Sequence, residues 1–197
     1  IAATGILNHT QVYAINYLVS SLKNANLWSK FNALYPFIGG TSTTHKYNLK
    51  DPRDLDAAFR LQFNGGWTHS STGAKPNGTT GYADTFLIPS TSLSTSSVHT
   101  SYYSRDNITL TSNQIFFDAF IGANQCYQSY LDLTGPTWIC DSFDVVNGRV
   151  SSPITNFSSR TDGFFIANRT SSIINKLHRN SSILSSTGGT TANSASI

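Results

Sequence analysis

The segment YPFIGGTSTTHKYNLKDPRDLDAAFRLQFNGGWTHSSTG, residues 35–73, ends in a two-residue alternation of side chains. One parity is apolar throughout and comprises Ala57, Phe59, Leu61 and Phe63. The other parity is mainly polar and comprises Ala58, Arg60, Gln62 and Asn64. This period predicts a β-strand with one buried and one solvated face. Gly65-Gly66 then ends the predicted strand, and Trp67 follows at the turn.

The chain after Pro36 consists mostly of short apolar runs that end at Gly, Pro, Asn or Ser. These runs predict strands at residues 45–49, 56–63, 82–88, 98–105, 114–122, 125–133, 137–143, 163–168 and 173–179, with a short return strand at 183–185. No helix-length connection separates them, which favours a sandwich or barrel over βαβ units. The predicted buried set comprises Phe59, Leu61, Phe63, Leu87, Ile115, Phe117, Leu131, Leu133, Phe165 and Leu177.

The N-terminal region has the period of a helix. Across residues 10–27, apolar side chains recur at helical spacing, namely Val12, Ile15, Val19 and Leu22. Asn8 followed by Gln11 resembles a capping box, and a further helical turn is predicted from Leu27, ending before Pro36. We expect this helix to dock on the β-sheet body, and the alternative is a helix that binds a partner.

Composition limits the classes of function. Only 12% of the 197 residues are charged, the net charge is +3, and Lys and Arg form no cluster, so we expect no nucleic-acid partner. No apolar run approaches the roughly 18 residues of a membrane span, so we expect none. The length suits one domain. The absence of Met leads us to expect a processed product, a fragment or part of something longer.

The two cysteines, Cys126 and Cys140, flank the loop at Gly135-Pro136. A hairpin there would bring them close enough for a disulfide, and the alternative is a pair of half-buried thiols. No Cys-x-x-Cys or paired His spacing occurs, so a zinc site is not predicted.

Several blocks of the chain resemble successive parts of one family. The blocks are LWSKFNALYPFIGG (27–40), THKYNLKDPRDLDAAFRLQF (44–63), GGWTHSSTGAKPNGTTGYADTFLIPS (65–90), GFFIANRTSS (163–172) and KLHRNSSIL (176–184). They are similar to the LamG-like, concanavalin A-like jelly-roll domains of tailed-bacteriophage structural proteins. The resemblance implies an all-β, antiparallel two-sheet jelly-roll sandwich at residues 36–185, entered through an N-terminal helical segment at 1–35. Residues 186–197 would then form a polar tail that leads into strands this chain lacks.

The same resemblance implies a function in a virus particle. It predicts a virion structural domain (capsid decoration, fibre or tail-associated) that assembles as an oligomer with other virion subunits. A surface rich in Ser, Thr and Asn with few charges favours such packing. We also expect contact with host-surface carbohydrate. The alternative is a free-standing, lectin-like carbohydrate-binding module.

Candidate binding residues follow from sugar chemistry, in which aromatic rings stack on pyranoses and short polar groups bind hydroxyls. The candidates for carbohydrate are Trp67, His69, Tyr82, Tyr103 and Trp138. Trp67 lies in a glycine-rich loop, where ligand contacts are common, although a core role is the competing interpretation. We expect no cofactor other than calcium, for which weak candidates are Asp84, Asp106 and Asn107. No segment supplies the six to eight oxygens or so that calcium takes.

Catalysis is not expected. Glycoside hydrolases with related sandwiches need two flanking carboxyl groups, yet the chain has no Glu. Two aspartate pairs, Asp54 with Asp56 and Asp141 with Asp144, are interpreted as residues of turns and strand entries. A Gly-x-Ser-x-Gly elbow is also absent from the sequence. A glycan-cleaving enzyme is therefore a distant third hypothesis.

Overall fold

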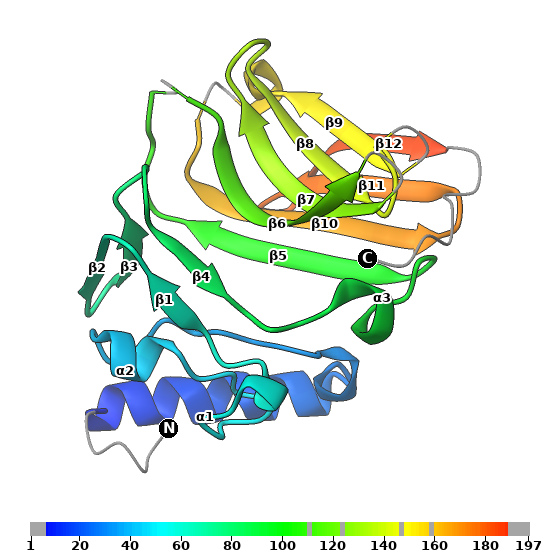
Figure 1. The fold of residues 1–197 in the computed structure, drawn as a ribbon. Coiled ribbons are helices and arrows are strands. Elements are labelled where there is room, and N and C mark those ends of the chain that lie inside the picture. The colour runs from blue at the N-terminus through cyan, green and yellow to red at the C-terminus, as the bar shows by residue number, and fades with distance from the viewer. Residues whose placement is uncertain (1–6, 110–111, 123–124, 146–147, 158–159, 189–197) are drawn as a thin grey trace. The chain divides into compact units, whose positions relative to one another are not determined.

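The computed structural model describes residues 7–109, 112–122, 125–145, 148–157 and 160–188. The chain forms two compact units, Ile1–Leu87 and Ile88–Ile197, with an N-terminal helix and four antiparallel sheets (Figure 1). The boundary predicted near residue 36 is therefore misplaced, because residues 36–87 belong to the same unit as the helix. The predicted tail at 186–197 begins inside a strand, and its residues 189–197 lie outside the described part of the chain.

The first unit begins with the predicted helix. Helix α1 spans His9–Asn24 and has the predicted capping box, in which Asn8 Oδ1 accepts from the Gln11 amide at 2.9 Å and Gln11 Oε1 accepts from the Asn8 amide at 3.1 Å. The predicted apolar stripe is the less exposed side of the helix, with Val12, Ile15, Val19 and Leu22 half-buried. The 3₁₀ turn η2 (Trp28–Lys30) confirms the second helical turn.

The predicted strand at residues 56–63 is wrong over most of its length. A 3₁₀ turn, η3, occupies Asp56–Ala58, and Phe59 follows with φ +55°, in the left-handed region. The main chain is held there by distant partners, because Tyr35 Oη donates to Phe59 O at 2.5 Å and the Leu61 amide donates to Lys46 O at 2.8 Å. Ala58, on the parity predicted to be solvated, is consequently buried.

The predicted strand at residues 45–49 is also wrong. Helix α2 occupies Ser42–His45, and the chain then turns around the fully buried side chain of Asn48. Asn48 Oδ1 accepts from the amides of Leu34 (2.9 Å) and Lys50 (3.0 Å), and Nδ2 donates to Ala58 O (3.0 Å) and Asn32 O (3.2 Å). A single buried amide thus satisfies four main-chain groups that strand pairing would otherwise satisfy.

Two short ladders complete the first unit. Strand β1 (Gln62–Asn64) pairs with β4 (Tyr82–Asp84), which is shorter than the predicted strand at 82–88. The hairpin of β2 (Trp67–Ser70) and β3 (Gly73–Pro76) was not predicted. Glycine is required at the turn before it, since Gly65 has φ +69° and a Cβ there would lie 1.9 Å from Thr80 O.

The second unit contains two four-stranded antiparallel sheets that face each other (Figure 1). One sheet has the order β6-β7-β8-β9 and the other β12-β11-β10-β5. Their bounds are β5 Val98–Ser104, β6 Gln114–Gly122, β7 Gln125–Asp132, β8 Thr137–Ser142, β9 Arg149–Pro153, β10 Gly163–Ser171, β11 Ile174–Arg179 and β12 Ser182–Gly188, with α3 at Pro89–Ser92 and η4 at Ile154–Phe157. The predicted strands of this region are confirmed to within a few residues, and β9 was missed.

The core of this unit lies between the two sheets. Its buried residues are Leu131, Trp138, Cys140, Val150, Phe165, Ala167 and Leu177. Trp138 meets Phe165 edge-on at a centroid distance of 4.9 Å, and Tyr102 stacks on Phe165 at 5.1 Å. Two residues predicted to be buried are in fact exposed, Ile115 (64%) and Leu133 (38%). Register shifts within the β6–β7 ladder explain Ile115, because an extra residue reverses the alternation of faces.

Candidate functional site

Trp138 does not form part of a binding surface. Its side chain is fully buried, and its indole N–H donates to Ser129 Oγ at 2.7 Å. A ring with no exposed surface cannot stack on a sugar. The prediction that Trp138 binds carbohydrate is therefore wrong, since the ring fills the space between the sheets.

Trp67, His69 and Tyr82 lie in the first unit, where β2 and β4 carry them. The Trp67 indole N–H donates to Asn64 O (3.0 Å) and to Tyr82 O (3.1 Å), and the ring packs edge-on against Phe63 at 5.1 Å. Trp67 thus joins two ladders of its own unit, and packing accounts for its position. Tyr82 remains 59% exposed.

The two cysteines are thiols and no disulfide joins them. Cys140 is paired with Ser129 across β7 and β8, whereas Cys126 lies three positions before Ser129. Because successive residues of a strand alternate between faces, Cys126 and Cys140 point to opposite faces of the sheet. Register therefore excludes the disulfide, and the alternative of two thiols is confirmed, although both are fully buried rather than half-buried.

Burial also makes both thiols unreactive. Burial raises the pKa of Cys126 to about 12 and raises that of Cys140 as well. We expect a thiol reagent such as DTNB to label neither cysteine in the folded protein and both after unfolding without reductant. Labelling that needs reductant, or rapid labelling of the folded chain, would contradict this expectation.

The aspartate pairs have structural partners. Asp54 and Asp56 both contact Arg60, and Asp54 also pairs with Lys46 at 2.5 Å. The fully buried Asp141 accepts from Arg149 at 2.6 and 2.8 Å and from Gln128 at 2.6 Å. Asp144 is buried too. These contacts agree with the interpretation of the aspartates as turn and strand residues.

The calcium candidates belong to different parts of the fold. Asp84, in the first unit, accepts from Asn64 Nδ2 at 3.1 Å. In the second unit, Asn107 Oδ1 accepts from the Thr161 amide at 2.9 Å, and the main-chain oxygen of Asp106 accepts from Thr161 Oγ1 at 3.2 Å. The Asn107 oxygen is thus engaged by the protein itself. Within the described ranges, no three His, Cys, Asp or Glu side chains gather as metal ligands.

Tyr103 lies on the outer face of the sheet β12-β11-β10-β5, where exposed aromatic and polar residues are arranged in rows. Phe165, Ala167 and Leu177 point from this sheet into the core, so the alternate residues point outward. Register places the outward residues in three rows across the strands. The rows are Tyr103 with Phe164; Ser101, Ile166, His178 and Ile183; and His99, Asn168, Lys176 and Ser186. None of these residues is a carboxylate.

The first row is aromatic. Tyr103 is 69% exposed and Phe164, directly opposite it on β10, is 40% exposed. Cross-strand neighbours on one face have Cβ atoms about 5 Å apart, so the two residues lie side by side on the outer face and are called the aromatic platform below. A second exposed aromatic pair, Tyr13 and Tyr17, stacks on α1, so the feature that favours the sheet face as a binding surface is the polar row beside its rings.

The third row is polar. His99 Nδ1 lies 2.6 Å from Asn168 Oδ1, and His99 Nε2 lies 3.1 Å from Ser101 Oγ. The carbonyl oxygen of Asn168 only accepts, so Nδ1 of the imidazole carries the proton and Nε2 accepts from the Ser101 hydroxyl. The amide nitrogen of Asn168 and the ammonium of Lys176 add hydrogen-bond donors to the same row.

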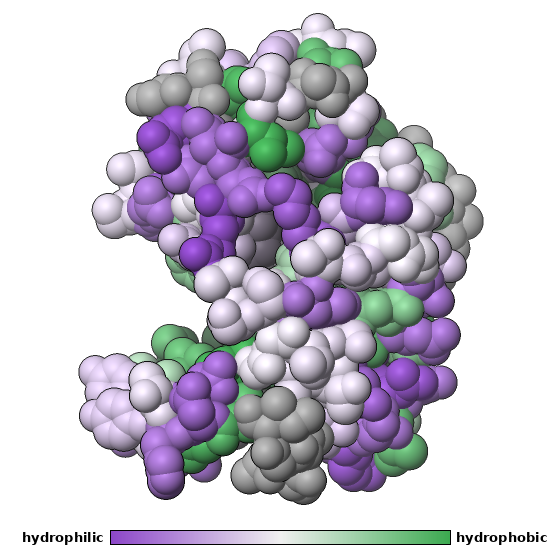
Figure 2. All heavy atoms as spheres, turned by 90° about the vertical axis from the view of Figure 1, so that its left-hand side faces the viewer, coloured by the Kyte–Doolittle hydropathy of each residue, from purple (hydrophilic) through white to green (hydrophobic). Residues whose placement is uncertain are grey.

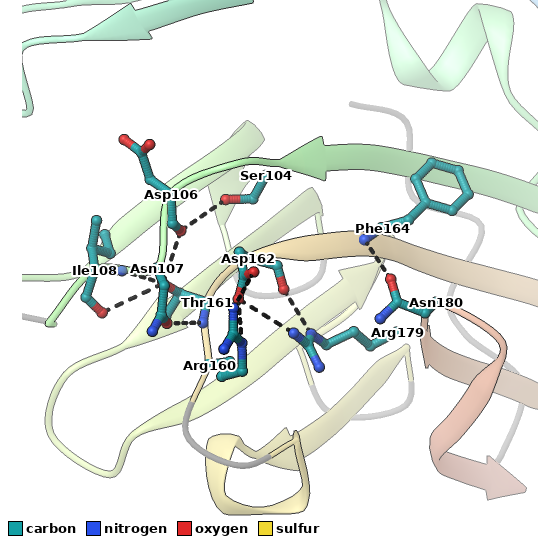
Figure 3. A network of polar contacts seen from close by, with 10 residues as sticks. All are labelled: Ser104, Asp106, Asn107, Ile108, Arg160, Thr161, Asp162, Phe164, Arg179 and Asn180. Atoms are coloured by element: carbon teal, nitrogen blue, oxygen red, sulfur yellow. Dashed lines mark hydrogen bonds and ion pairs between the residues drawn. The ribbon is translucent and has the colours of Figure 1, made fainter.

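A network of polar contacts holds the strand ends that carry the aromatic platform (Figure 3). Asn180 makes two hydrogen bonds to the main chain of Phe164. Its Oδ1 accepts from the Phe164 amide at 3.0 Å, and its main-chain amide donates to Phe164 O at 2.7 Å. The Asp162 carboxylate receives Arg160 at 2.6 Å and Arg179 at 3.4 Å.

The segment that leaves β5 is held by the same network. Thr161 Oγ1 accepts from the Ile108 amide at 2.6 Å, and the Asp106 oxygen receives Ser104 Oγ at 3.3 Å (Figure 3). Both strands are therefore anchored directly beside the ring pair, so Tyr103 and Phe164 are presented from a fixed backbone.

Sequence reasoning found only Tyr103 on this face. Phe164, His99, Asn168 and Lys176 were missed, although the alternation in Gly163–Ser171 already separates Phe164, Ile166 and Asn168 from the buried set. What no local pattern reveals is that β5 pairs with β10, which places Tyr103 beside Phe164.

None of the helices in the described part of the chain is both long and apolar enough to cross a bilayer.

Comparisons with protein-family models, with curated proteins and with solved structures find no match to this chain.

Proposed function

We propose that this chain is a structural domain of a virus particle whose outer sheet face contacts host-surface carbohydrate. The observation that carries the carbohydrate contact is the exposed pair of Tyr103 and Phe164 beside a polar row on the same rigid sheet. Aromatic rings offer their faces to the C–H surface of a pyranose, and the polar row offers donors and acceptors to its hydroxyls.

The dimensions of the face suit an oligosaccharide. Outward residues two positions apart on a strand lie about 7 Å from each other, so the aromatic and polar rows are about 13 Å apart. A disaccharide spans about this length. One sugar would stack on the rings of Tyr103 and Phe164 while the next reaches Asn168 and Lys176.

The surface supports a role in an assembly. Only 12% of the chain is charged, and one face of the molecule is mostly polar or weakly polar, with hydrophobic residues in separate groups (Figure 2). Few charges reduce repulsion between repeated copies. The resemblance to bacteriophage structural domains supports the same setting, and the two facing antiparallel sheets support a concanavalin A-like, jelly-roll-related sandwich.

The carbohydrate contact is tested with a glycan array and a matched pair of tyrosine variants. Tyr103→Ala is expected to weaken binding of the recognised glycan about tenfold or more, because a central aromatic contact contributes about 1.4 kcal/mol or more. Phe164→Ala should have a smaller effect in the same direction, since Phe164 is less exposed.

Tyr13→Ala is the control, because Tyr13 is 71% exposed on α1, in the other unit. Equal binding by all variants would refute this face, and absence of any glycan binding would refute the carbohydrate contact altogether. Tyr82→Ala tests the exposed tyrosine of the first unit in the same assay.

The assembly role is tested separately. A virion component should be present in purified particles in fixed stoichiometry. Glycan binding by a protein that particles do not contain would instead favour the free-standing lectin-like module.

A further inference from the structure

Two histidines of the first unit are joined ring to ring. His45, at the end of α2, is fully buried, and His69 lies on β2. Their Nδ1 atoms are 2.9 Å apart, and the other ring nitrogen of His45, Nε2, lies 3.2 Å from the main-chain nitrogen of Gly40. Three separate chain segments therefore meet through one imidazole.

The direction of these hydrogen bonds follows from Gly40. Its amide can only donate, so His45 Nε2 is the acceptor and the proton of the neutral ring is on Nδ1. That N–H donates to His69 Nδ1, which must then be unprotonated, so the proton of His69 is on Nε2. Each ring thus uses its only basic nitrogen as an acceptor.

A further proton has no acceptable place in this arrangement. On His69 Nδ1 it would put two N–H donors 2.9 Å apart, and on His45 Nε2 it would oppose the Gly40 amide. We propose that the His45–His69 pair is an acid-sensitive latch, which holds the Gly39-Gly40 turn and the β2–β3 hairpin together while both rings are neutral and releases them on protonation.

The surroundings of the pair do not compensate a positive charge. The rings packed around it are Phe37 on His45 and Phe63 and Trp67 on His69. Phe63 lies 4.6 Å and Trp67 6.1 Å from His69, so a protonated His69 would gain at most a cation–π attraction from these rings. That weak attraction does not replace the hydrogen bond that protonation would break.

The charged groups on neighbouring elements are directed elsewhere. Lys46, the residue after α2, pairs with Asp54 at 2.5 Å. Lys75 of β3 is opposite Thr68, whereas His69 is opposite Ala74, so Lys75 and His69 are on different faces of the hairpin. α2 has no titratable side chain besides His45, and β1 has none.

Both histidines respond to this environment in the same direction. Burial and the neighbouring His69 lower the pKa of His45 to about 4, and burial lowers the pKa of His69. The open state, with ordinary histidines of pKa about 6.5, binds more protons than the closed state. The latch is therefore fully stable above about pH 6.5 and weakens as the pH falls toward 4.

The turn held by the latch is conformationally demanding. Gly39 and Gly40 have φ values of +99° and +84°, and a Cβ on Gly39 would lie 2.6 Å from Thr44 Oγ1. Release of the Gly40 amide would allow this turn to leave α2. The latch lies outside the proposed carbohydrate face and involves none of its residues, so the two proposals stand or fall separately.

The tautomers give the first test, on the 197-residue chain with ¹⁵N-labelled histidine. At pH 7.5, long-range ¹H–¹⁵N NMR spectra are expected to show His45 protonated at Nδ1 and His69 at Nε2. The opposite tautomer at either ring would overturn the proposal.

Amide exchange gives the second test. The Gly40 exchange rate, corrected for its intrinsic pH dependence, should report an opening constant that rises about tenfold per pH unit for each proton taken up below pH 6.5. His69→Gln offers His45 an acceptor that does not titrate. The opening constant of this variant should therefore rise less steeply as the pH falls, because the proton taken up by His69 no longer contributes. His9→Gln, on α1, is the control and should keep the original slope. A pH-independent opening constant, or an unchanged slope in His69→Gln, would overturn the proposal.

Discussion

Replacing Trp138 by alanine is expected to lower the free energy of unfolding of the second unit by about 3–5 kcal/mol. The ring is fully buried and touches Phe165 from the opposite sheet, so its removal leaves a cavity between the sheets. It also leaves Ser129 Oγ, which is buried, without the indole donor. Urea denaturation followed by far-ultraviolet circular dichroism measures the change.

Two further variants separate the causes. Trp138→Phe keeps a ring in the core and loses the indole N–H, so its effect should lie between those of the wild type and the alanine variant. Tyr103→Ala removes an exposed ring from the same unit and should change stability by no more than about 0.5 kcal/mol. A Trp138→Ala variant as stable as Tyr103→Ala would contradict the described core.

Replacing Asn48 by alanine is expected to destabilise the first unit by about 4 kcal/mol. The side chain makes four buried or half-buried hydrogen bonds to the main chain, and each contributes about 1 kcal/mol net. The loss is large because the abandoned main-chain groups have few other partners in a unit with a small apolar core. Trp28 and Trp67, both in this unit, report its unfolding by fluorescence.

Asn48→Asp refines this experiment. Aspartate keeps an acceptor for the Leu34 and Lys50 amides but places a carboxylate against the oxygens of Asn32 and Ala58, so it should also destabilise strongly. Asn24→Ala, at the end of α1, is the matched surface control and should have little effect. Equal stability of the Asn48 and Asn24 variants would show that the buried amide does not organise this unit.

The strands of the second unit could be predicted from the sequence because the alternation of apolar and polar residues along each strand matches which of its residues are buried. Residues 114–122 were predicted as a strand and form β6, and 98–105 nearly matches β5. The alternation of side chains and the turn residues at the strand ends are both local signals, which can be recognised from a few neighbouring residues. The N-terminal helix was readable for the same reason, since its cap involves only Asn8 and Gln11.

The segment at residues 56–63 shows where this reasoning fails. Its alternation is as regular as that of a strand, but Arg60 pairs with Asp56 at 2.7 Å and the main chain bonds to Tyr35 and Lys46. The ion pair is local, but the two main-chain contacts join segments that are distant in sequence, and together these contacts favour a 3₁₀ turn. The period of the side chains could not reveal them.

The candidate site was predicted in part. Tyr102 and Tyr103 are adjacent in a strand, so one had to face outward, and the structure leaves Tyr103 exposed. Trp138 was a candidate for carbohydrate binding because its residue type suits stacking on a sugar, yet it is buried. Residue type suggests chemistry, whereas exposure is decided by which sheet covers the strand.

The sequence by itself determined the β-rich character of this protein, its capped N-terminal helix, most strand boundaries after residue 98 and its low surface charge. These properties depend on local periodicity and composition. Only the tertiary structure decided that Tyr103 lies beside Phe164, that the cysteines point to opposite faces and that His45 meets His69. Each of those outcomes depends on strand register or on contacts between distant segments, and the free energy that selects them belongs to the packed core rather than to any local stretch of chain.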